Sequence, residues 1–488
     1  REATDHPPKP IWSDLMATHP EIRERLRTSA TMFERKLWRE DLERWERETK
    51  PAAIREQLEV QGVDPSSLSG EALLAHLERT RENAKRQLYV HHLFNMPALL
   101  PVGDFLAHAQ EWTGRPPTEL LGLLKGASPV SLGAADELAR LSGAIGRHPR
   151  AQAILFSSEP PEEVLASLRA MPGDVGAATS AYLDLVGYRL VNVEDVGEPF
   201  TLEMPDILVK TIRCAVEDTG ASRDDDALAR NTEAVRDAVP AAHRPAFDEL
   251  LVEARAMHRL RDERGIYCDL WAYGIARRAM LAAGRRLAEK GRIAEPAHFV
   301  EAGYAEMRAL VEGNGGPAAE ELAERGRYRS VANLAEVPPA LGPPPGDPLP
   351  LEWLPPAAAR LERAIRVYIG AMFFAPQARH EGRTVRGLPV SPGTYEGAAR
   401  LVRGTGDFAR IHRGDVLVTG STTAAFNCVL PLLGAIVTDR GGLLSHAAIV
   451  AREYGIPAVV GCTDATRRIP DSSRVRVDGG AGEAVVVS

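Results

Sequence analysis

The chain has 488 residues, with 59 Lys and Arg against 67 Asp and Glu, a formal net charge of −8 and 44% hydrophobic residues. This ordinary globular composition allows two or more buried cores. The mild acidity argues against a nucleic-acid-binding surface spread over the whole chain. No uninterrupted apolar run reaches the roughly 18 residues that a membrane span requires, so we expect neither nucleic acid nor membrane as a partner.

The cysteines lie far apart in the sequence and form no Cys-x-x-Cys pair. This spacing argues against a disulfide framework and a thiolate zinc site, so we expect a cytoplasmic protein. The four cysteines are Cys214, Cys268, Cys428 and Cys462.

The first 336 residues read as helical almost throughout. Apolar residues recur at spacings of three and four, as at Leu73, Leu74 and Leu77, which is typical of amphipathic helices. Period-2 strands are scarce, so we predict an all-α domain over residues 1–336. The predicted helices include residues 21–48, 70–94, 134–145, 161–170, 227–238, 245–264, 270–290 and 301–311.

A connector follows at residues 337–386. It begins with a stretch from Val337 to Pro356 that holds nine prolines, which excludes regular helix or central strand there. One apolar helix over residues 357–374 and a polar hinge complete it. A semi-rigid connector of this kind suits a domain that swings, although a passive spacer explains it equally well.

The last segment, residues 387–488, has a different pattern. It holds 15 of the 42 glycines and none of the tryptophans. Short β-rich runs separated by glycine turns surround one predicted helix over residues 445–454. We therefore predict a multidomain protein, with a large all-α domain followed by a small α/β domain.

The chemically informative stretch lies at residues 438–461. A predicted strand ends at Thr438, a double glycine follows at Gly441 and Gly442, and a helix opens at Ser445 and His446. Ser is a favoured N-cap, and a helix N-terminus attracts phosphate and favours a neutral imidazole. The glycines allow close approach to a ligand, and an arginine two residues before Gly442, Arg440, can pair with phosphate oxygens.

A lone histidine at a helix start usually carries no function, but the surrounding sequence changes that interpretation. The runs GG-x-x-SHAAIVARE (441–453) and GIPAVVG (455–461) resemble the phosphohistidine signature of the phosphoenolpyruvate-utilising enzyme family, and GLPVSPG (387–393) resembles the opening turn of its mobile, swivelling domain. The resemblance implies that His446 is transiently phosphorylated and passes the phosphoryl group on by covalent, ping-pong transfer. Arg440, Ser445, Thr438, Gly441 and Gly442 would hold the phosphoryl group.

The helical region resembles the acceptor-binding domain of the rifampin phosphotransferases within that family. The runs AYLDLVGYR (181–189), GLLKG (122–126), LRDER (260–264) and GRRLAEKG (284–291) carry this resemblance. No glycine-rich nucleotide loop lies upstream. We therefore expect a separate ATP-grasp or phosphoenolpyruvate-dependent partner to charge His446, with ATP or phosphoenolpyruvate as donor. No cofactor is assigned to this chain, no metal site is predicted, and Mg²⁺ is left open.

Two departures from the family pattern bear on the reaction. The strand after Asp415 runs into GSTTAAFNC (420–428) without the usual tryptophan, and VNVEDV (191–196) replaces an acidic run. Either change is consistent with a new acceptor or with loss of phosphoryl transfer.

Several further residues are candidates to bind the substrate. His91 and His92 end a predicted helix, where related acceptor domains carry a histidine, although a half-buried structural histidine is the more common case. Glu194, beside Asp195, has the chemistry of a general base. Arg261 is a candidate to line an acceptor pocket with Asp262 and Arg264, although a solvated charged helix face is the commoner explanation.

Two functions follow from these observations. The first is a phosphotransferase, or its acceptor-and-histidine subunit, acting through His446 on a hydroxyl of a small organic acceptor. The second is a repurposed enzyme in which His446 is a general acid/base that dehydrates, cyclises or isomerises a biosynthetic metabolite, with His91 or His92 and Glu194 as partners. A non-catalytic carrier or regulatory module is a weaker third.

Overall fold

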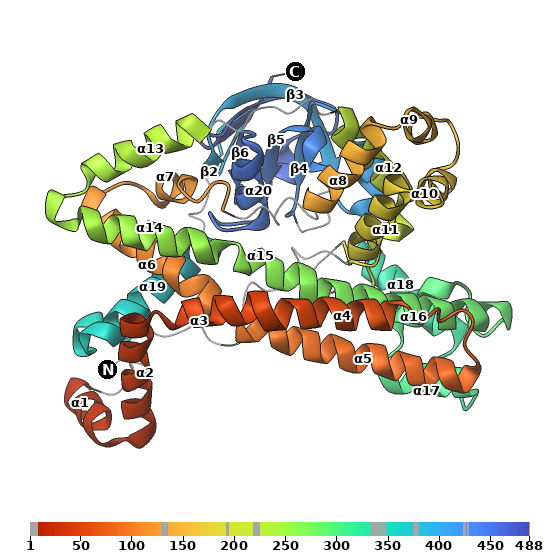
Figure 1. The fold of residues 1–488 in the computed structure, drawn as a ribbon, viewed down its shortest axis with the longest axis horizontal. Coiled ribbons are helices and arrows are strands. Elements are labelled where there is room, and N and C mark those ends of the chain that lie inside the picture. Colours follow the sequence, from red (N-terminus) through yellow and green to blue (C-terminus); the bar gives the residue numbers. More distant parts are fainter. Residues whose placement is uncertain are drawn as a thin grey trace.

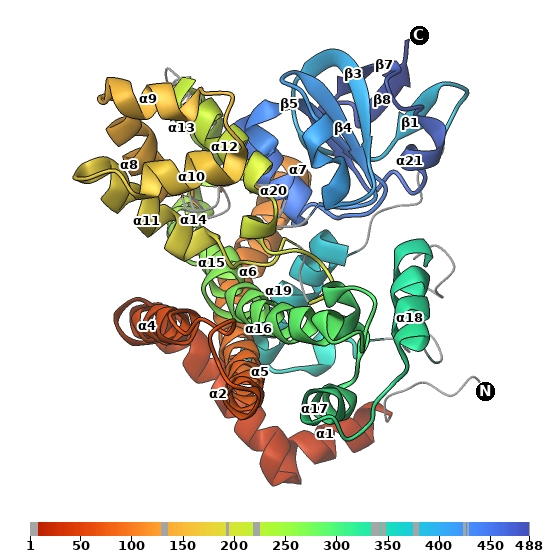
Figure 2. The same cartoon turned by 90° about the vertical axis from the view of Figure 1, so that its right-hand side faces the viewer.

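The computed structural model has a large helical part and a smaller α/β part (Figures 1 and 2), so the predicted fold class is confirmed. Glu194, Cys428 and half of the proline-rich stretch at residues 337–356 lie outside the residues it describes. The described residues are 8–127, 135–191, 195–217, 225–332, 342, 348–373, 380–422, 426 and 429–487.

The helices of the helical part run from the N-terminus to residue 373 of the described chain. Their bounds are α1 (Lys9–Thr18), α2 (Pro20–Arg35), α3 (Leu37–Arg44), α4 (Lys50–Gln61), α5 (Gly70–Leu93), α6 (Asn95–Thr113), α7 (Pro117–Gly122), α8 (Ala135–Gly146), α9 (Pro149–Leu155), α10 (Pro161–Arg169), α11 (Asp174–Val186), α12 (Pro205–Glu217), α13 (Asp225–Ala238), α14 (Arg244–His258), α15 (Leu260–Arg264), α16 (Leu270–Glu289), α17 (Tyr304–Glu312), α18 (Ala319–Val331) and α19 (Pro356–Phe373).

One predicted helix is broken in the structure, and α6 is among the helices that were not predicted. The single helix predicted over residues 21–48 is broken at Lys36, whose φ of 51° lies in the left-handed region. Helix α6 was not predicted, because its prolines are usually breakers. Pro97 lies in the first turn of α6, where a backbone N–H has no partner within the helix. Pro101 lies four residues later, and the N–H that it lacks would have donated to the carbonyl of Pro97.

Two buried glutamates attach the N-terminal helices to α14 and α15. Glu253 accepts hydrogen bonds from the indole of Trp38 at 2.8 Å and from Lys36 at 3.0 Å. Glu263 accepts from the indole of Trp45 at 2.8 Å. Both carboxylates are almost fully buried, and buried charges of this kind require such partners.

Helix α19 belongs to the helical packing, although its sequence position lies in the predicted connector. Its Ala364 packs so tightly on Gly103 of α6 that a Cβ at Gly103 would lie 2.2 Å from the Ala364 carbonyl oxygen. Arg360 of α19 also donates to the Asp104 carboxylate at 2.9 and 2.6 Å. These contacts hold α19 against α6, and the rest of the connector assignment stays a prediction.

The α/β part is one sheet of eight strands in the described chain, in the order β1-β8-β7-β3-β4-β5-β6-β2. The strands from β3 to β6 are parallel, and the others pair antiparallel. Their bounds are β1 (Thr384–Arg386), β2 (Leu388–Ser391), β3 (Thr394–Val402), β4 (Asp415–Thr419), β5 (Leu433–Thr438), β6 (Ala458–Val460), β7 (Arg474–Asp478) and β8 (Glu483–Val486).

Helix α20 (His446–Tyr454) lies between this sheet and the helical part (Figure 1). Its buried residues Ala447 and Val450 share one hydrophobic core with Phe247 of α14 and Leu106 of α6. The predicted helix over residues 445–454 is confirmed. Because the core is continuous, the α/β part is docked on the helical part.

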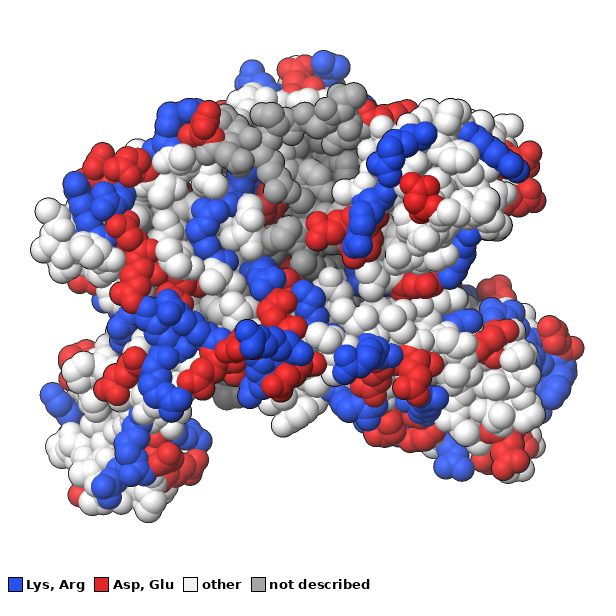
Figure 3. Space-filling model, in the orientation of Figure 1, with Lys and Arg blue, Asp and Glu red and all other residues white. Residues whose placement is uncertain are grey.

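On the face drawn in Figure 3, acidic and basic side chains alternate over the long helices. Ion pairs such as Arg79–Glu59 on α5 and α4 account for part of this alternation. None of the described helices is long and apolar enough to cross a membrane.

Candidate functional site

The site forms where two neighbouring parallel strands end. In the register of β4 and β5, Thr419 lies opposite Thr438, so the loops that follow the two strands leave the same edge of the sheet. In open α/β sheets, this carboxyl edge is where ligands bind. The first loop carries Thr422, and the second leads to His446 at the start of α20.

Ser445 and His446 form the predicted helix start. Ser445 has extended backbone angles, and its hydroxyl accepts a hydrogen bond from the N–H of Ala448, so it is the N-cap. His446 is therefore the first residue of α20, beside the unpaired N–H groups of the first turn. The three residues from Ala447 to Ile449 are buried, which fixes the helix against the sheet.

The His446 ring is oriented by Thr422. Its Nδ1 lies 3.0 Å from the Thr422 hydroxyl oxygen, and Thr422 is itself buried. Removal of the imidazole from water lowers the pKa of His446 to about 4. The imidazole is therefore neutral at neutral pH, as the helix N-terminus predicted.

An arginine and an aspartate of the helical part lie near enough to this ring to influence its pKa. Asp262 raises the pKa of His446 and Arg261 lowers it, although removal from water outweighs both. Arg261 Nη1 lies 3.2 Å from Asp262 Oδ1, and the two side chains are only 13% and 14% exposed. These two residues are therefore not part of a solvated helix face, and that interpretation of the sequence is wrong for Arg261 and Asp262.

The double glycine allows a close contact within the protein. A Cβ at Gly442 would lie 2.4 Å from the carbonyl oxygens of both Ala371 and Met372, near the C-terminal end of α19. Gly441 has a φ of +131°, a value that side chains rarely allow. The predicted role of these glycines toward a ligand stays a prediction, and the structure adds a second reason for Gly442.

Thr438 and Arg440 differ in exposure. Thr438 is buried, and its hydroxyl donates to the carbonyl oxygen of Arg440 at 2.7 Å. Arg440 is exposed, and its side chain forms no ion pair with any residue of the described ranges. Its guanidinium is therefore accessible to a phosphate from solution.

His91 and His92 have partners other than His446. His91 Nδ1 lies 2.9 Å from Oδ1 of the buried Asp269, and Arg264 donates to the carbonyl oxygen of His91 at 3.2 Å. His92 is exposed, and its Nδ1 lies 3.0 Å from the side-chain nitrogen of Asn95. The predicted residue Glu194 lies outside the described residues.

Two family models match the chain. Residues 411–482 match the mobile domain of PEP-utilising enzymes, and residues 91–262 match the fourth domain of rifampicin phosphotransferase. His446 lies within the first match and Arg261 within the second, so the site contains residues from both matched regions. Residues 411–482, called the mobile domain below, are similar to the mobile domain of PEP-utilising enzymes.

The curated relatives agree with this assignment. A rifampicin phosphotransferase of a Streptomyces species is 30% identical over 86% of this chain and 47% of its own length. That of Streptomyces sviceus is 29% identical over 70% of this chain and 38% of its own length. A phosphoenolpyruvate synthase of Aeropyrum pernix is 48% identical over 20% of this chain and 12% of its own length. The chain thus spans less than half of each of these relatives.

The mobile domain is also held by a polar contact with the fourth-domain match. The backbone N–H of Gly126 donates to both carboxylate oxygens of Glu453, at 3.0 and 2.8 Å. Gly126 ends the GLLKG run that carried the family resemblance. Arg255 of α14 supports this loop by donating to the carbonyl oxygen of Leu123 at 2.7 Å.

Three residues near His446 were not predicted as site residues. Thr422 lies in the loop that departs from the family pattern, Tyr368 of α19 hydrogen-bonds Arg261, and His258 is buried beside Arg261 and Asp262. Burial lowers the pKa of His258 to about 4, and its Nδ1 has no hydrogen-bond partner among the described residues. The one signal that could have placed Thr422 near His446 is the parallel pairing of β4 and β5, whose loops leave the same edge of the sheet.

Metal and thiol chemistry receive no support from the described part of the chain. No group of three or more His, Cys, Asp or Glu side chains there is arranged to hold a metal ion. Cys214, Cys268 and Cys462 are buried free thiols whose pKa values are raised by that burial. Cys428 lies outside the described residues.

Proposed function

We propose that the chain is the acceptor-and-histidine part of a phosphotransferase that acts on a hydroxyl of a small organic molecule. The observation that carries the proposal is the position of His446 at the start of α20, beside the Thr422 hydroxyl, where Arg261 and Asp262 of the other family match are near enough to influence its pKa. The names of the relatives support a phosphotransferase in general, and the acceptor is part of the proposal.

The neutral ring supplies the nucleophile. When the Thr422 oxygen accepts a hydrogen bond from Nδ1–H, Nε2 carries the lone pair that attacks phosphorus. The N–P bond then forms while the bond from phosphorus to the donor's leaving group breaks. A protonated imidazole has no such lone pair, so the lowered pKa of His446 favours this step.

The second step returns the phosphoryl group to oxygen. The acceptor hydroxyl attacks phosphorus, the N–P bond breaks, and the hydroxyl proton leaves to a base. In this proposal Asp262, a carboxylate that influences the pKa of His446, accepts that proton, and Arg261 neutralises charge on the phosphoryl oxygens. Holding the acceptor beside His446 supplies much of the rate through proximity.

The docked position of the mobile domain suits transfer of the phosphoryl group to the acceptor. Phosphorylation of His446 also needs a phosphoryl donor. We propose that a separate ATP-grasp or phosphoenolpyruvate-dependent partner charges His446 after the mobile domain undocks. Arg440 is the exposed guanidinium near the helix start and would pair with the donor's phosphate. The general acid/base alternative stays a prediction. Of the two histidines it offers as a partner, His91 is hydrogen-bonded to Asp269 and His92 is exposed.

Phosphorus labelling tests the proposal. The purified chain is incubated with cell extract and either [γ-³²P]ATP or [³²P]phosphoenolpyruvate. We expect label on the protein that is lost in acid and kept in base, absent from His446→Gln and present in His92→Gln, which alters an exposed histidine. Turnover of a metabolite by the purified chain without any phosphoryl donor would instead establish the acid/base alternative.

A further inference from the structure

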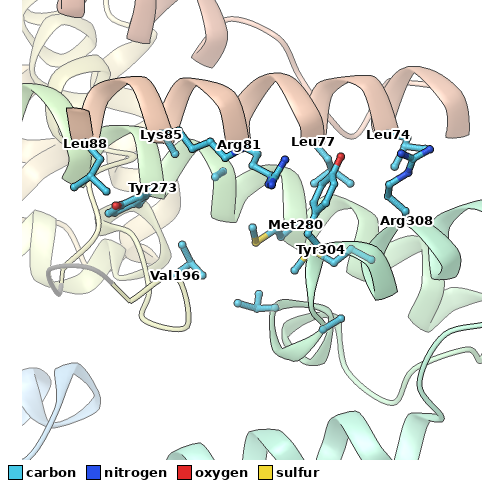
Figure 4. Close-up of a pocket in the computed structure, with 15 residues that line it drawn as sticks. Leu74, Leu77, Arg81, Lys85, Leu88, Val196, Tyr273, Met280, Tyr304 and Arg308 are labelled. Carbon is cyan, nitrogen blue, oxygen red and sulfur yellow. The ribbon is translucent and has the colours of Figure 1, made fainter. Parts of the chain in front are cut away.

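A pocket separate from the His446 site lies in the helical part, between α5, α16 and α17 (Figure 4). It has a volume of about 400 Å³, which is in the range of small-molecule sites. On α5 its lining runs from Leu74 to Leu88 at helical spacing. Fourteen residues at 1.5 Å each make this wall about 21 Å long, so the pocket is elongated.

The floor of the pocket is apolar. Leu77, Ala276, Val300 and Met307 are buried in it, and the pocket lies above the core that contains Leu77 and Met307. Met280 also lines it, and methionine side chains adapt to irregular apolar ligands. An apolar ligand would gain free energy by displacing water from this floor.

The charged residues of the lining are all basic. Arg81, Lys85 and Arg308 line the pocket, and no Asp or Glu does so among its described lining residues. Their carboxylate partners Glu78, Glu82 and Glu312 lie outside the lining. An anionic group is therefore favoured at the pocket and a cationic one is not.

Arg81 is held in place over the pocket. Its guanidinium lies 4.1 Å from the centre of the Tyr304 ring, and Figure 4 shows the two side chains next to each other on the α5 side. Its hydrogen bonds to Glu78 and Glu82, at 3.1 and 3.3 Å, use Nη1. Nε and Nη2 make no hydrogen bond within the described ranges, so they are available to a carboxylate or phosphate.

We propose that this pocket binds an elongated ligand with an apolar chain and one anionic headgroup. The chain lies on the Leu77–Met307 floor and the headgroup pairs with Arg81. The inference does not depend on phosphoryl transfer, because none of these residues belongs to the His446 site.

Binding of matched ten-carbon probes tests the proposal. Decanoate, decanol and decyltrimethylammonium are titrated calorimetrically into the full chain below their micelle-forming concentrations. We expect saturable binding of decanoate, weaker binding of decanol and none of the cation. Equal binding of all three, or no saturable binding of decanoate, would overturn the proposal.

Variants locate the binding. Arg81→Gln should weaken decanoate binding at least tenfold and leave decanol binding unchanged. Ala84→Leu, which fills the floor, should weaken both, with thermal unfolding as the check that it folds. Arg79→Gln, on the same helix but outside the lining, and His446→Gln should bind decanoate like the unaltered chain. Unchanged decanoate binding in both Arg81→Gln and a folded Ala84→Leu would place the ligand elsewhere.

Discussion

The hydroxyl oxygen of Thr422 lies 3.0 Å from Nδ1 of His446. The two residues are 24 positions apart and follow neighbouring parallel strands, β4 and β5. This contact orients the imidazole, and when the hydroxyl oxygen accepts from Nδ1–H the lone pair lies on Nε2. It also assigns a role to a loop that departs from the family's sequence pattern.

Replacing Thr422 by Val should slow phosphorylation of His446 roughly tenfold, because a lost hydrogen bond to the ring costs about 1 kcal/mol or somewhat more. Thr422→Ser keeps the hydroxyl and should restore most of the rate. The measurement is the initial rate of acid-labile labelling. Equal rates in the Val and Ser variants would show that the hydroxyl does not orient the ring.

Arg261→Gln should separate the two half-reactions. Because Arg261 comes from the helical part and not from the mobile domain that carries His446, labelling of His446 should be nearly normal. Transfer of the label to an acceptor in the extract should fall at least tenfold. The measurement is a pulse of labelled donor followed by a chase. Loss of labelling with normal transfer would place Arg261 in the charging step.

Gly442→Ala should weaken docking of the mobile domain. The new methyl group would lie 2.4 Å from two backbone carbonyl oxygens of α19, and backbone cannot move aside as a flexible side chain does. We expect a loss of about 1–3 kcal/mol of stability and a larger radius of gyration by X-ray scattering. Gly420→Ala is the matched control, since nothing lies within 4 Å of its added Cβ.

Gly103→Ala should destabilise the helical part strongly, because its Cβ would lie 2.2 Å from the Ala364 carbonyl oxygen. Gly370→Ala, on α19 itself, meets nothing within 4 Å and should stabilise the helix by up to about 1 kcal/mol. Urea unfolding measures both. A neutral Gly103→Ala would mean that α19 is not packed on α6 in solution.

Stability should fall in acid because of two histidines. The folded-state pKa values of His446 and His258 are about 4, below the ordinary value of about 6.5. Between these values the unfolded chain binds more protons, so the unfolding free energy falls as the pH drops from 6.5 toward 4 and is unaffected by these groups above 6.5.

The expected slope is up to about 1.4 kcal/mol per pH unit for each histidine. His446→Gln and His258→Gln should each make urea midpoints less dependent on pH below 6.5, whatever their effect on absolute stability. The region above pH 6.5 serves as the internal control. A slope identical to that of the unaltered chain in both variants would mean that neither imidazole is buried and neutral.

The amino-acid sequence by itself determined the local features. Apolar spacing located helices such as α5 and α16, short β-rich runs indicated that the last segment contains strands, and Ser445 marked the start of α20. These predictions succeed because helical periodicity, turns and caps depend on residues a few positions apart. The break at Lys36 and the helix through Pro101 were not predicted, because tertiary packing outweighs local propensity at these positions.

Only the tertiary structure decided what surrounds His446. Thr422 comes from a strand loop and Arg261 from α15, and nothing in their local sequences indicates that both lie near one ring. Tyr368 of α19 in turn lies near Arg261. Gly442 is predicted to let backbone approach a ligand, and the structure shows a second reason for it, because its missing side chain makes room for α19. Local sequence specifies elements, whereas a site between domains depends on burial and long-range packing that only the folded chain provides.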